Sequence, residues 1–401
     1  MLRTTLRQKS SDILQRRVNT RFNRKAVIVA GELSGEIHAA HLVKAIKERL
    51  SLDFSGVGSK KLAAAGVHII QDYGQISLVG LSEVFSKIRH IRRAFERIRS
   101  YLVADPPSLL ILVDFPGFNL RLAKVAHGLG IPTIYFIPPQ VWAWNKGRIN
   151  QIKRYVNLVI CILPFEETIY RNSEIPVAYV GHPFAQTVKP ILGKRELLSE
   201  IGLDREDSKI MSILPGSREN EIVTHLPLLL RCVDLVKREI PDLVVLMPLS
   251  DNTKDSLIDR LLRPDTPLVR LRGRTYDALS ASDAAVVVSG SATLEAALLG
   301  APAIVLYKIS CFSYLAARLL VKVKYISLPN LVAGKEIYPE HIQRIDPEKI
   351  AAQVVSMVQN GTASIRDELT RVADLLGHQD SYGLAANEIE RFLKNFYGTL
   401  S

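Results

Sequence analysis

Short, wholly apolar runs alternate with helix-spaced segments along the first half of the chain. The runs fall at residues 26–30, 109–113, 133–136, 158–162 and 177–180. Segments between them, such as residues 120–129, carry apolar side chains at intervals of three and four. Strands that are apolar on both faces and are separated by helices indicate a parallel sheet covered by helices on both sides.

The same rhythm restarts after residues 183–193, with apolar runs at 209–214, 243–247, 268–271, 284–288 and 303–306. From Pro347 onward the spacing is helical to the end of the chain. We therefore expect an α/β protein with two Rossmann-like, doubly wound domains facing a cleft, followed by a helical C-terminus. The expected divisions are residues 1–24, 25–185, 186–370 and 371–401, and the last segment is expected to pack back on the first domain.

Composition adds a preference for anionic partners. The 52 basic residues outnumber the 40 acidic ones, which gives a net charge of +12. No apolar run reaches the ~18 residues that a membrane-spanning helix needs. The three cysteines, Cys161, Cys232 and Cys311, lie far apart, as is typical of thiols in a reducing compartment. The first 24 residues form a basic extension or a transit peptide, and they lack the apolar core of a secretory signal. These features favour a cytoplasmic protein.

Two loops of the first domain directly follow predicted strands. Gly31-Glu-Leu-Ser-Gly35 opens a helix after the first strand, where glycines permit a tight turn and the helix N-terminus favours an anion. Asp114 follows the run at 109–113, where a general base or a loop-capping residue would lie. From position alone the two interpretations of Asp114 are equally good.

The second domain repeats this arrangement. Leu214-Pro-Gly-Ser-Arg218 follows its first strand, and Ser289-Gly-Ser-Ala-Thr-Leu-Glu295 follows the run at 284–288. Backbone amides with Arg218 could hold a diphosphate, and Glu295 could accept hydrogen bonds from ribose hydroxyls. Each loop alone could be a surface turn, but the pair favours a nucleotide diphosphate. No P-loop or G-x-G-x-x-G sequence is present.

Residues 82–102 predict an amphipathic helix with a strongly basic polar face. Its apolar positions recur every three or four residues, and seven Lys, Arg and His residues lie between them. Packing on the sheet and binding to an anionic membrane surface are both typical of such a helix. We expect the membrane-facing residues to include Arg89, Arg92, Arg93 and Phe95. The interleaved aromatic and basic residues of a nucleic-acid platform are absent from the sequence, and no spacing suggests a metal site.

Taken in order, the loops resemble those of lipid-A-disaccharide synthases over about residues 25–395. The most specific segments are Pro139-Gln-Val-Trp-Ala-Trp144 and Ser327-Leu-Pro-Asn-Leu331. The remaining segments are the loops described above, Leu163-Pro-Phe-Glu166, Gly181-His-Pro183, Ala333-Gly334 and Pro339-Glu340. The Gly-rich loops are shared more loosely with other glycosyltransferases of the GT-B type.

The resemblance implies an inverting transfer without a cofactor or a metal. A 2,3-diacylglucosamine unit would move from UDP to the 6-hydroxyl of 2,3-diacylglucosamine 1-phosphate, and a β-1,6-linked disaccharide 1-phosphate and UDP would form. By motif, Asp114 matches the candidate base, and Glu32 matches a second candidate catalytic residue or a structural partner on the acceptor side. The implied acceptor and acyl side comprises Ser34, Gly35, Asn119 and Trp142. The implied nucleotide side comprises Gly216, Ser217, Arg218, Gly290, Ser291, Thr293, Glu295 and Asn330.

Several positions depart from the family pattern. Glu36 stands where the family usually has Asp, Ala39 stands where Gly is common, and Gly117 replaces a frequent acidic residue. Alternatives remain open: a lipid-linked muramyl transferase, a UDP-sugar 2-epimerase, or a catalytically silent membrane-surface protein with this fold. The resemblance implies a cytoplasmic enzyme bound peripherally to the inner membrane. Exchange of the C-terminal helices between two copies would give a homodimer.

Overall fold

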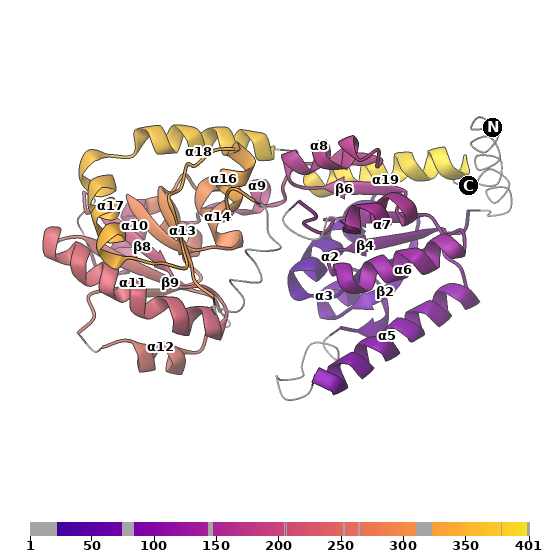
Figure 1. Cartoon of the computed structure of the whole chain (residues 1–401), viewed down its shortest axis with the longest axis horizontal. Coiled ribbons are helices and arrows are strands. Elements are labelled where there is room, and N and C mark those ends of the chain that lie inside the picture. The colour runs from indigo at the N-terminus through magenta and orange to yellow at the C-terminus, as the bar shows by residue number, and fades with distance from the viewer. Residues whose placement is uncertain are drawn as a thin grey trace. The chain divides into compact units, whose positions relative to one another are not determined.

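The computed structural model describes residues 22–73, 84–142, 147–203, 205, 207–251, 253–263, 265–309, 323–377 and 379–398, with side chains from residue 89 in the second range. The chain divides into two compact units (Figure 1). Unit 1 comprises residues 1–181 and 379–401, and unit 2 comprises residues 182–378. Most of the basic N-terminal extension, Cys311 and Trp144 lie outside the described residues.

Unit 1 is built on a seven-stranded parallel sheet in the order β3-β2-β1-β4-β5-β6-β7. This order turns back at β1, as in the doubly wound dinucleotide-binding fold. The strands are β1 Lys25–Ala30, β2 Asp53–Gly58, β3 His68–Asp72, β4 Leu109–Val113, β5 Thr133–Phe136, β6 Leu158–Cys161 and β7 Val177–Tyr179. The helices are α2 Leu33–Lys47, α3 Lys60–Ala64, α5 Val84–Ala104, α6 Pro116–Gly128, α7 Gly147–Tyr155, α8 Pro164–Asn172 and α19 Ser381–Tyr397.

The unbroken apolar runs form the central strands because side chains on both faces are buried. Val27 and Val29 pack with the core beneath α5, α6 and α7, while Ala26 and Ile28 point to the face that α2 covers. The C-terminal helix α19 lies against α2, where Tyr382 stacks on His41 and its hydroxyl hydrogen-bonds His38 Nδ1 at 2.9 Å. The C-terminal helix therefore packs back on unit 1.

Unit 2 contains a six-stranded parallel sheet in the order β10-β9-β8-β11-β12-β13. Its strands are β8 Ile210–Leu214, β9 Val244–Leu249, β10 Val269–Arg272, β11 Ala284–Val288, β12 Ala303–Tyr307 and β13 Glu340–Ile342. Its helices are α9 Phe184–Thr187, α10 Lys194–Glu200, α11 Glu219–Glu239, α12 Asp255–Leu261, α13 Thr275–Ala281, α14 Ser291–Leu298, α16 Leu328–Ala333, α17 Pro347–Asn360 and α18 Ala363–Leu376. The expectation of two Rossmann-like units and a helical C-terminus is confirmed.

Along the chain, the boundaries between the units fall at residues 181/182 and 378/379, whereas the sequence predicted them at 185/186 and 370/371. Two sets of contacts explain the difference. The amide of His182 donates a hydrogen bond to the carbonyl oxygen of Leu376 at 2.8 Å, which ties the residues directly after the first boundary to unit 2. Helix α18 packs against α14 and α16 of the same unit.

Candidate functional site

In unit 1 the two predicted loops follow neighbouring strands. β1 and β4 pair directly, and the strand order reverses between them, so Gly31-Glu32 and Asp114 emerge at one topological switch point. Ligands of open α/β sheets bind outside the carboxyl ends of the strands at such points. The structure thus brings together the first loop and the candidate base.

Asp114 and Phe115 both adopt left-handed backbone conformations, with φ of 46° and 47°. Such conformations are unfavourable for residues other than glycine and cluster at functional sites. Gly31 makes room for this turn, since a Cβ atom on it would lie 2.2 Å from the Phe115 ring. At Gly35 a Cβ would lie 3.6 Å from Asp114 Cβ, so the first turn of α2 runs close beside the aspartate.

The surroundings of Asp114 suit a proton acceptor. Burial raises the pKa of its carboxyl group, and the nearby negative charge of Glu32 raises this pKa further. Glu32 itself is exposed at the N-cap of α2 and makes no side-chain capping hydrogen bond. A base whose pKa lies closer to neutral pH accepts a proton more effectively under physiological conditions.

Ser34 and Asn119, two of the predicted acceptor-side residues, differ in their exposure. Ser34 is exposed beside Glu32. Asn119 is fully buried, and its Nδ2 donates hydrogen bonds to the carbonyl oxygens of Val113 and Asp114 at 3.2 and 2.7 Å. Asn119 therefore holds the Asp114 turn in place, and its role on the acceptor side stays a prediction.

Trp142 is anchored by a buried carboxyl group. Its Nε1 donates a hydrogen bond to Glu166 Oε1 at 3.1 Å, and its ring lies edge-on to Phe165. Burial raises the pKa of Glu166 to about 8, although the Trp142 hydrogen bond lowers it. The sequence reasoning gave Glu166 no role, but its position in the first turn of α8 directly after a buried strand was a usable signal.

Glu36, one of the departures from the family pattern, serves the fold. Its side chain is buried and accepts hydrogen bonds from the amides of Ser59, Lys61 and Leu62 and from the Tyr73 hydroxyl. It therefore caps the N-terminus of α3 from a neighbouring helix.

Unit 2 repeats the switch-point arrangement. β8 and β11 are neighbours at the reversal of strand order, so the loops after Leu214 and Val288 emerge side by side. Gly216 has φ of 107°, and a Cβ there would lie 2.7 Å from Glu221. The Arg218 side chain is 81% exposed and makes a single ion pair with Glu221 at 3.3 Å among the described contacts. The two loops predicted for a diphosphate are thus adjacent.

The second loop of unit 2 divides into exposed and buried parts. Gly290 and Ser291 are exposed at the N-terminus of α14. Thr293 is fully buried and donates its hydroxyl hydrogen to the Gly290 carbonyl at 2.8 Å, so its side chain supports the turn and not a ligand. Glu295 is half-buried and accepts a hydrogen bond from the Tyr276 hydroxyl, and burial raises the pKa of its carboxyl group. Tyr276 was not foreseen, because it lies on a different helix.

Asn330 belongs to the interior of unit 2. It is fully buried, its Nδ2 donates to Tyr338 O and Glu340 Oε1, and its Oδ1 accepts from the amides of Ile337 and Tyr338. All of its polar capacity is used within the fold. The expectation that Asn330 binds the nucleotide is therefore corrected.

Helix α5 separates its cations from its apolar stripe. Arg89, Arg92 and Arg93 are exposed. Phe95 is half-buried and packs edge-on against Phe118 at 5.5 Å, so part of its ring contacts the core, and its membrane-facing position stays a prediction. These exposed arginines belong to the basic face of the helix.

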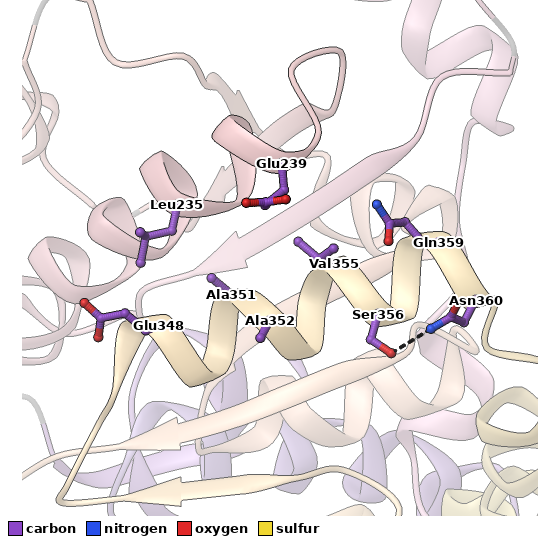
Figure 2. A pocket seen from close by; sticks show the side chains of 9 residues that line it. All are labelled: Leu235, Glu239, Glu348, Ala351, Ala352, Val355, Ser356, Gln359 and Asn360. Atoms are coloured by element: carbon purple, nitrogen blue, oxygen red, sulfur yellow. Dashed lines mark hydrogen bonds between the residues drawn. The ribbon is translucent and has the colours of Figure 1, made fainter.

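A groove in unit 2 lies between α11 and α17 (Figure 2). It contains none of the expected site residues, and its ionisable side chains are Glu239 and Glu348. These carboxylates disfavour an anionic ligand. Within the described ranges no group of three His, Cys, Asp or Glu side chains could hold a metal ion. No helix in the described part of the chain is long and apolar enough to cross a bilayer.

Comparison with known proteins agrees with the motifs. A family model described as lipid-A-disaccharide synthetase matches residues 26–387. A lipid-A-disaccharide synthase of Syntrophus aciditrophicus is 44% identical over 89% of this chain and 94% of its own length. One of Nitrosococcus oceani is 41% identical over 83% and 87%. The crystal structure of the calicheamicin glycosyltransferase CalG4 shares the fold, with a TM-score of 0.59, 14% identity and coverage of 92% and 98%.

Proposed function

This chain belongs to the lipid-A-disaccharide synthetase family, and we propose that it transfers 2,3-diacylglucosamine from UDP-2,3-diacylglucosamine to 2,3-diacylglucosamine 1-phosphate. The products are UDP and a β-1,6-linked lipid A disaccharide 1-phosphate. The observation that carries this proposal is the similarity to synthases over most of the chain. The placement of both pairs of predicted loops at the switch points of their sheets supports it.

Asp114 is the base in this mechanism. Its carboxylate removes the proton from the 6-hydroxyl of the acceptor as the oxygen attacks the anomeric carbon of the donor. The new C–O bond forms opposite the bond to UDP, which breaks, so the configuration at the anomeric carbon inverts. The raised pKa of Asp114 supports this role, because a more basic carboxylate accepts the proton more readily.

Unit 2 binds the nucleotide. Arg218 and the N-terminal ends of α11 and α14 stabilise the negative charge that develops on the departing diphosphate. Gly290 and Ser291 present exposed backbone to the phosphates, and Glu295, oriented by Tyr276, accepts hydrogen bonds from the ribose. The Ser217 amide can bind a phosphate oxygen only when it no longer donates its hydrogen bond to Glu221.

Exposed apolar side chains near the base suit the acyl chains of the acceptor. Leu33 and Ile37 lie one turn apart on α2, directly after Glu32, and are 51% and 38% exposed. Trp142 contributes a further aromatic surface in the same unit. Two acyl chains leaving the membrane need such surface to remain out of water.

In this proposal unit 1 binds the anionic cytoplasmic surface of the inner membrane, and the exposed arginines of α5 support this role. A homodimer formed by exchange of C-terminal helices stays a prediction, and light scattering on the purified protein tests it.

Release of UDP tests the proposed function. The purified protein receives UDP-2,3-diacylglucosamine in detergent, with and without 2,3-diacylglucosamine 1-phosphate. We expect UDP release that depends on the acceptor, with a disaccharide phosphate identified by mass spectrometry. Release without acceptor would indicate an epimerase or hydrolase, and no release in either case would refute the assignment.

A further inference from the structure

The backbone at the carboxyl ends of β4 and β5 is held in an unusual conformation. Asp114 and Phe115 are left-handed, and so is Ile137, with φ of 54°. The Asp114 amide donates a hydrogen bond to the Ile137 carbonyl, which links the two strained turns. Residues other than glycine keep a left-handed backbone conformation only when their surroundings fix it, and here three of them lie at neighbouring strand ends.

Two buried side chains provide that fixation at the Asp114 carbonyl. The Tyr135 hydroxyl donates a hydrogen bond to Asp114 O at 2.6 Å, and Asn119 Nδ2 donates another at 2.7 Å. Both side chains are fully buried. Tyr135 lies on β5 directly opposite Leu112 of β4, so its ring runs beneath the Asp114 turn from the neighbouring strand.

We propose that Tyr135 is a positioning residue for the catalytic base, acting through the backbone carbonyl of Asp114 to aim its carboxylate. The proposal rests on the assignment of Asp114 as the base. Without the hydroxyl, one of the two donors that maintain the left-handed turn is lost, and the turn relaxes toward ordinary backbone angles. The carboxylate then moves relative to the acceptor hydroxyl. A misplacement of about 1 Å can cost up to about a hundredfold in rate.

The test is Tyr135→Phe, which removes the hydroxyl and keeps the ring. We expect kcat to fall about ten- to a hundredfold while the KM values for both substrates stay within about twofold. The acid limb of the kcat profile should also move to lower pH, because a relaxed turn exposes Asp114 to water. The ionisable groups that face Asp114 in the described structure are Glu32 at the N-cap of α2 and Tyr135 on β5, and Arg148 on α7 acts on Tyr135. Partial unfolding would lower the whole profile without moving its midpoint.

Tyr338→Phe is a matched control. Tyr338 is also fully buried, and its hydroxyl donates to a backbone carbonyl, that of Ala301, at the same distance of 2.6 Å. Its loss should lower thermal stability to a similar degree and leave the pH midpoint unchanged. If Tyr135→Phe does not fold, Asn119→Ser removes the other donor to the same carbonyl, and the same loss of kcat and pH shift are expected.

The outcomes separate this inference from the assignment of the base. An inactive Asp114→Asn together with a Tyr135→Phe that behaves like Tyr338→Phe would overturn the role of Tyr135 alone. A fully active Asp114→Asn would overturn both. If Asp114→Asn is inactive and Tyr135→Phe shows both a lowered kcat and a shifted pH midpoint, the roles of Asp114 and Tyr135 are both supported.

Discussion

The carboxylate of Glu221 accepts a hydrogen bond from the backbone amide of Ser217 at 3.0 Å, and the same oxygen atom accepts one from the Arg218 amide at 3.2 Å. An anionic group of the protein thus occupies the two amides that the motif offers to a phosphate. Its other oxygen atom pairs with the Arg218 guanidinium. A diphosphate must compete with Glu221 for the same three donors.

Glu221→Gln should therefore tighten UDP binding, by up to about tenfold at low salt, because it removes a negative charge beside the diphosphate. Arg218→Ala should weaken UDP binding about ten- to a hundredfold, since it removes a charged hydrogen-bond donor. Isothermal titration calorimetry with UDP measures both changes. Glu219→Gln, in the same helical turn, controls for the general loss of acidic charge at the N-terminus of α11. Unchanged affinity in Glu221→Gln would contradict the competition.

Replacement of Asp114 by Asn should lower kcat about 10²- to 10⁴-fold, the range typical of a lost general base. The change keeps the shape of the side chain and removes only its ability to accept the proton. UDP affinity should stay the same, because the nucleotide loops belong to unit 2. Steady-state kinetics and calorimetry test the two halves of this prediction, and unchanged turnover would remove Asp114 from the mechanism.

The neighbouring carboxylate gives a prediction about pH. Glu32 raises the pKa of Asp114, and the unprotonated form of Asp114 is the active one, so kcat should fall as the pH drops through that raised pKa. Glu32→Gln removes the charge and lowers the pKa of Asp114. The acid limb of the kcat profile should then shift to lower pH. A lower kcat at every pH without a shift would instead show that Glu32 takes part in the chemistry.

Strands with unbroken apolar runs could be predicted to within one or two residues, because burial on both faces leaves a clear signal in the sequence. β2, β3 and β13 could not. β2 contains Gly56, where a Cβ would lie 1.9 Å from the Ile28 carbonyl oxygen. The close packing of β2 on β1 therefore requires a glycine, and this glycine interrupts the apolar run by which a strand is predicted. β3 and β13 are edge strands with half-buried polar positions, which resemble loops.

The candidate site was predictable where chemistry follows from position along a strand. Asp114 in unit 1, and Arg218 and Glu295 in unit 2, lie on loops or the first helical turns that follow neighbouring strands of their own sheets. Asn330 and Thr293 belong to the same motifs, but their polar atoms are used inside the fold, which spacing alone does not reveal. Tyr135 and Tyr276 contact their partners across 21 and 19 residues, so only the folded chain pairs them.

The exposed apolar pair on α2 should affect the lipid part of the substrate. Leu33→Ser with Ile37→Ser should raise the KM for the diacylated acceptor about tenfold, because each side chain would bury apolar surface against an acyl chain. The KM for a deacylated acceptor analogue should not change. Val103→Ser is a suitable control, since Val103 is 54% exposed in the same unit. It lies near the start of β4, whereas Asp114 follows the opposite, carboxyl end of that strand. Equal effects on both acceptors would show that the pair does not contact acyl chains.

The basic face of α5 should determine attachment to anionic membranes. Arg89, Arg92 and Arg93 are exposed, and none of them forms an ion pair in the described structure. Each cation near an anionic bilayer contributes about 1 kcal/mol, so reversing all three to Glu should weaken binding to phosphatidylglycerol vesicles at least about a hundredfold. Vesicle co-sedimentation measures the change, with phosphatidylcholine vesicles and high salt as controls. UDP affinity should be unaffected, which would show that unit 2 is intact. If the triple variant binds anionic vesicles as the parent does, the attachment depends on another surface.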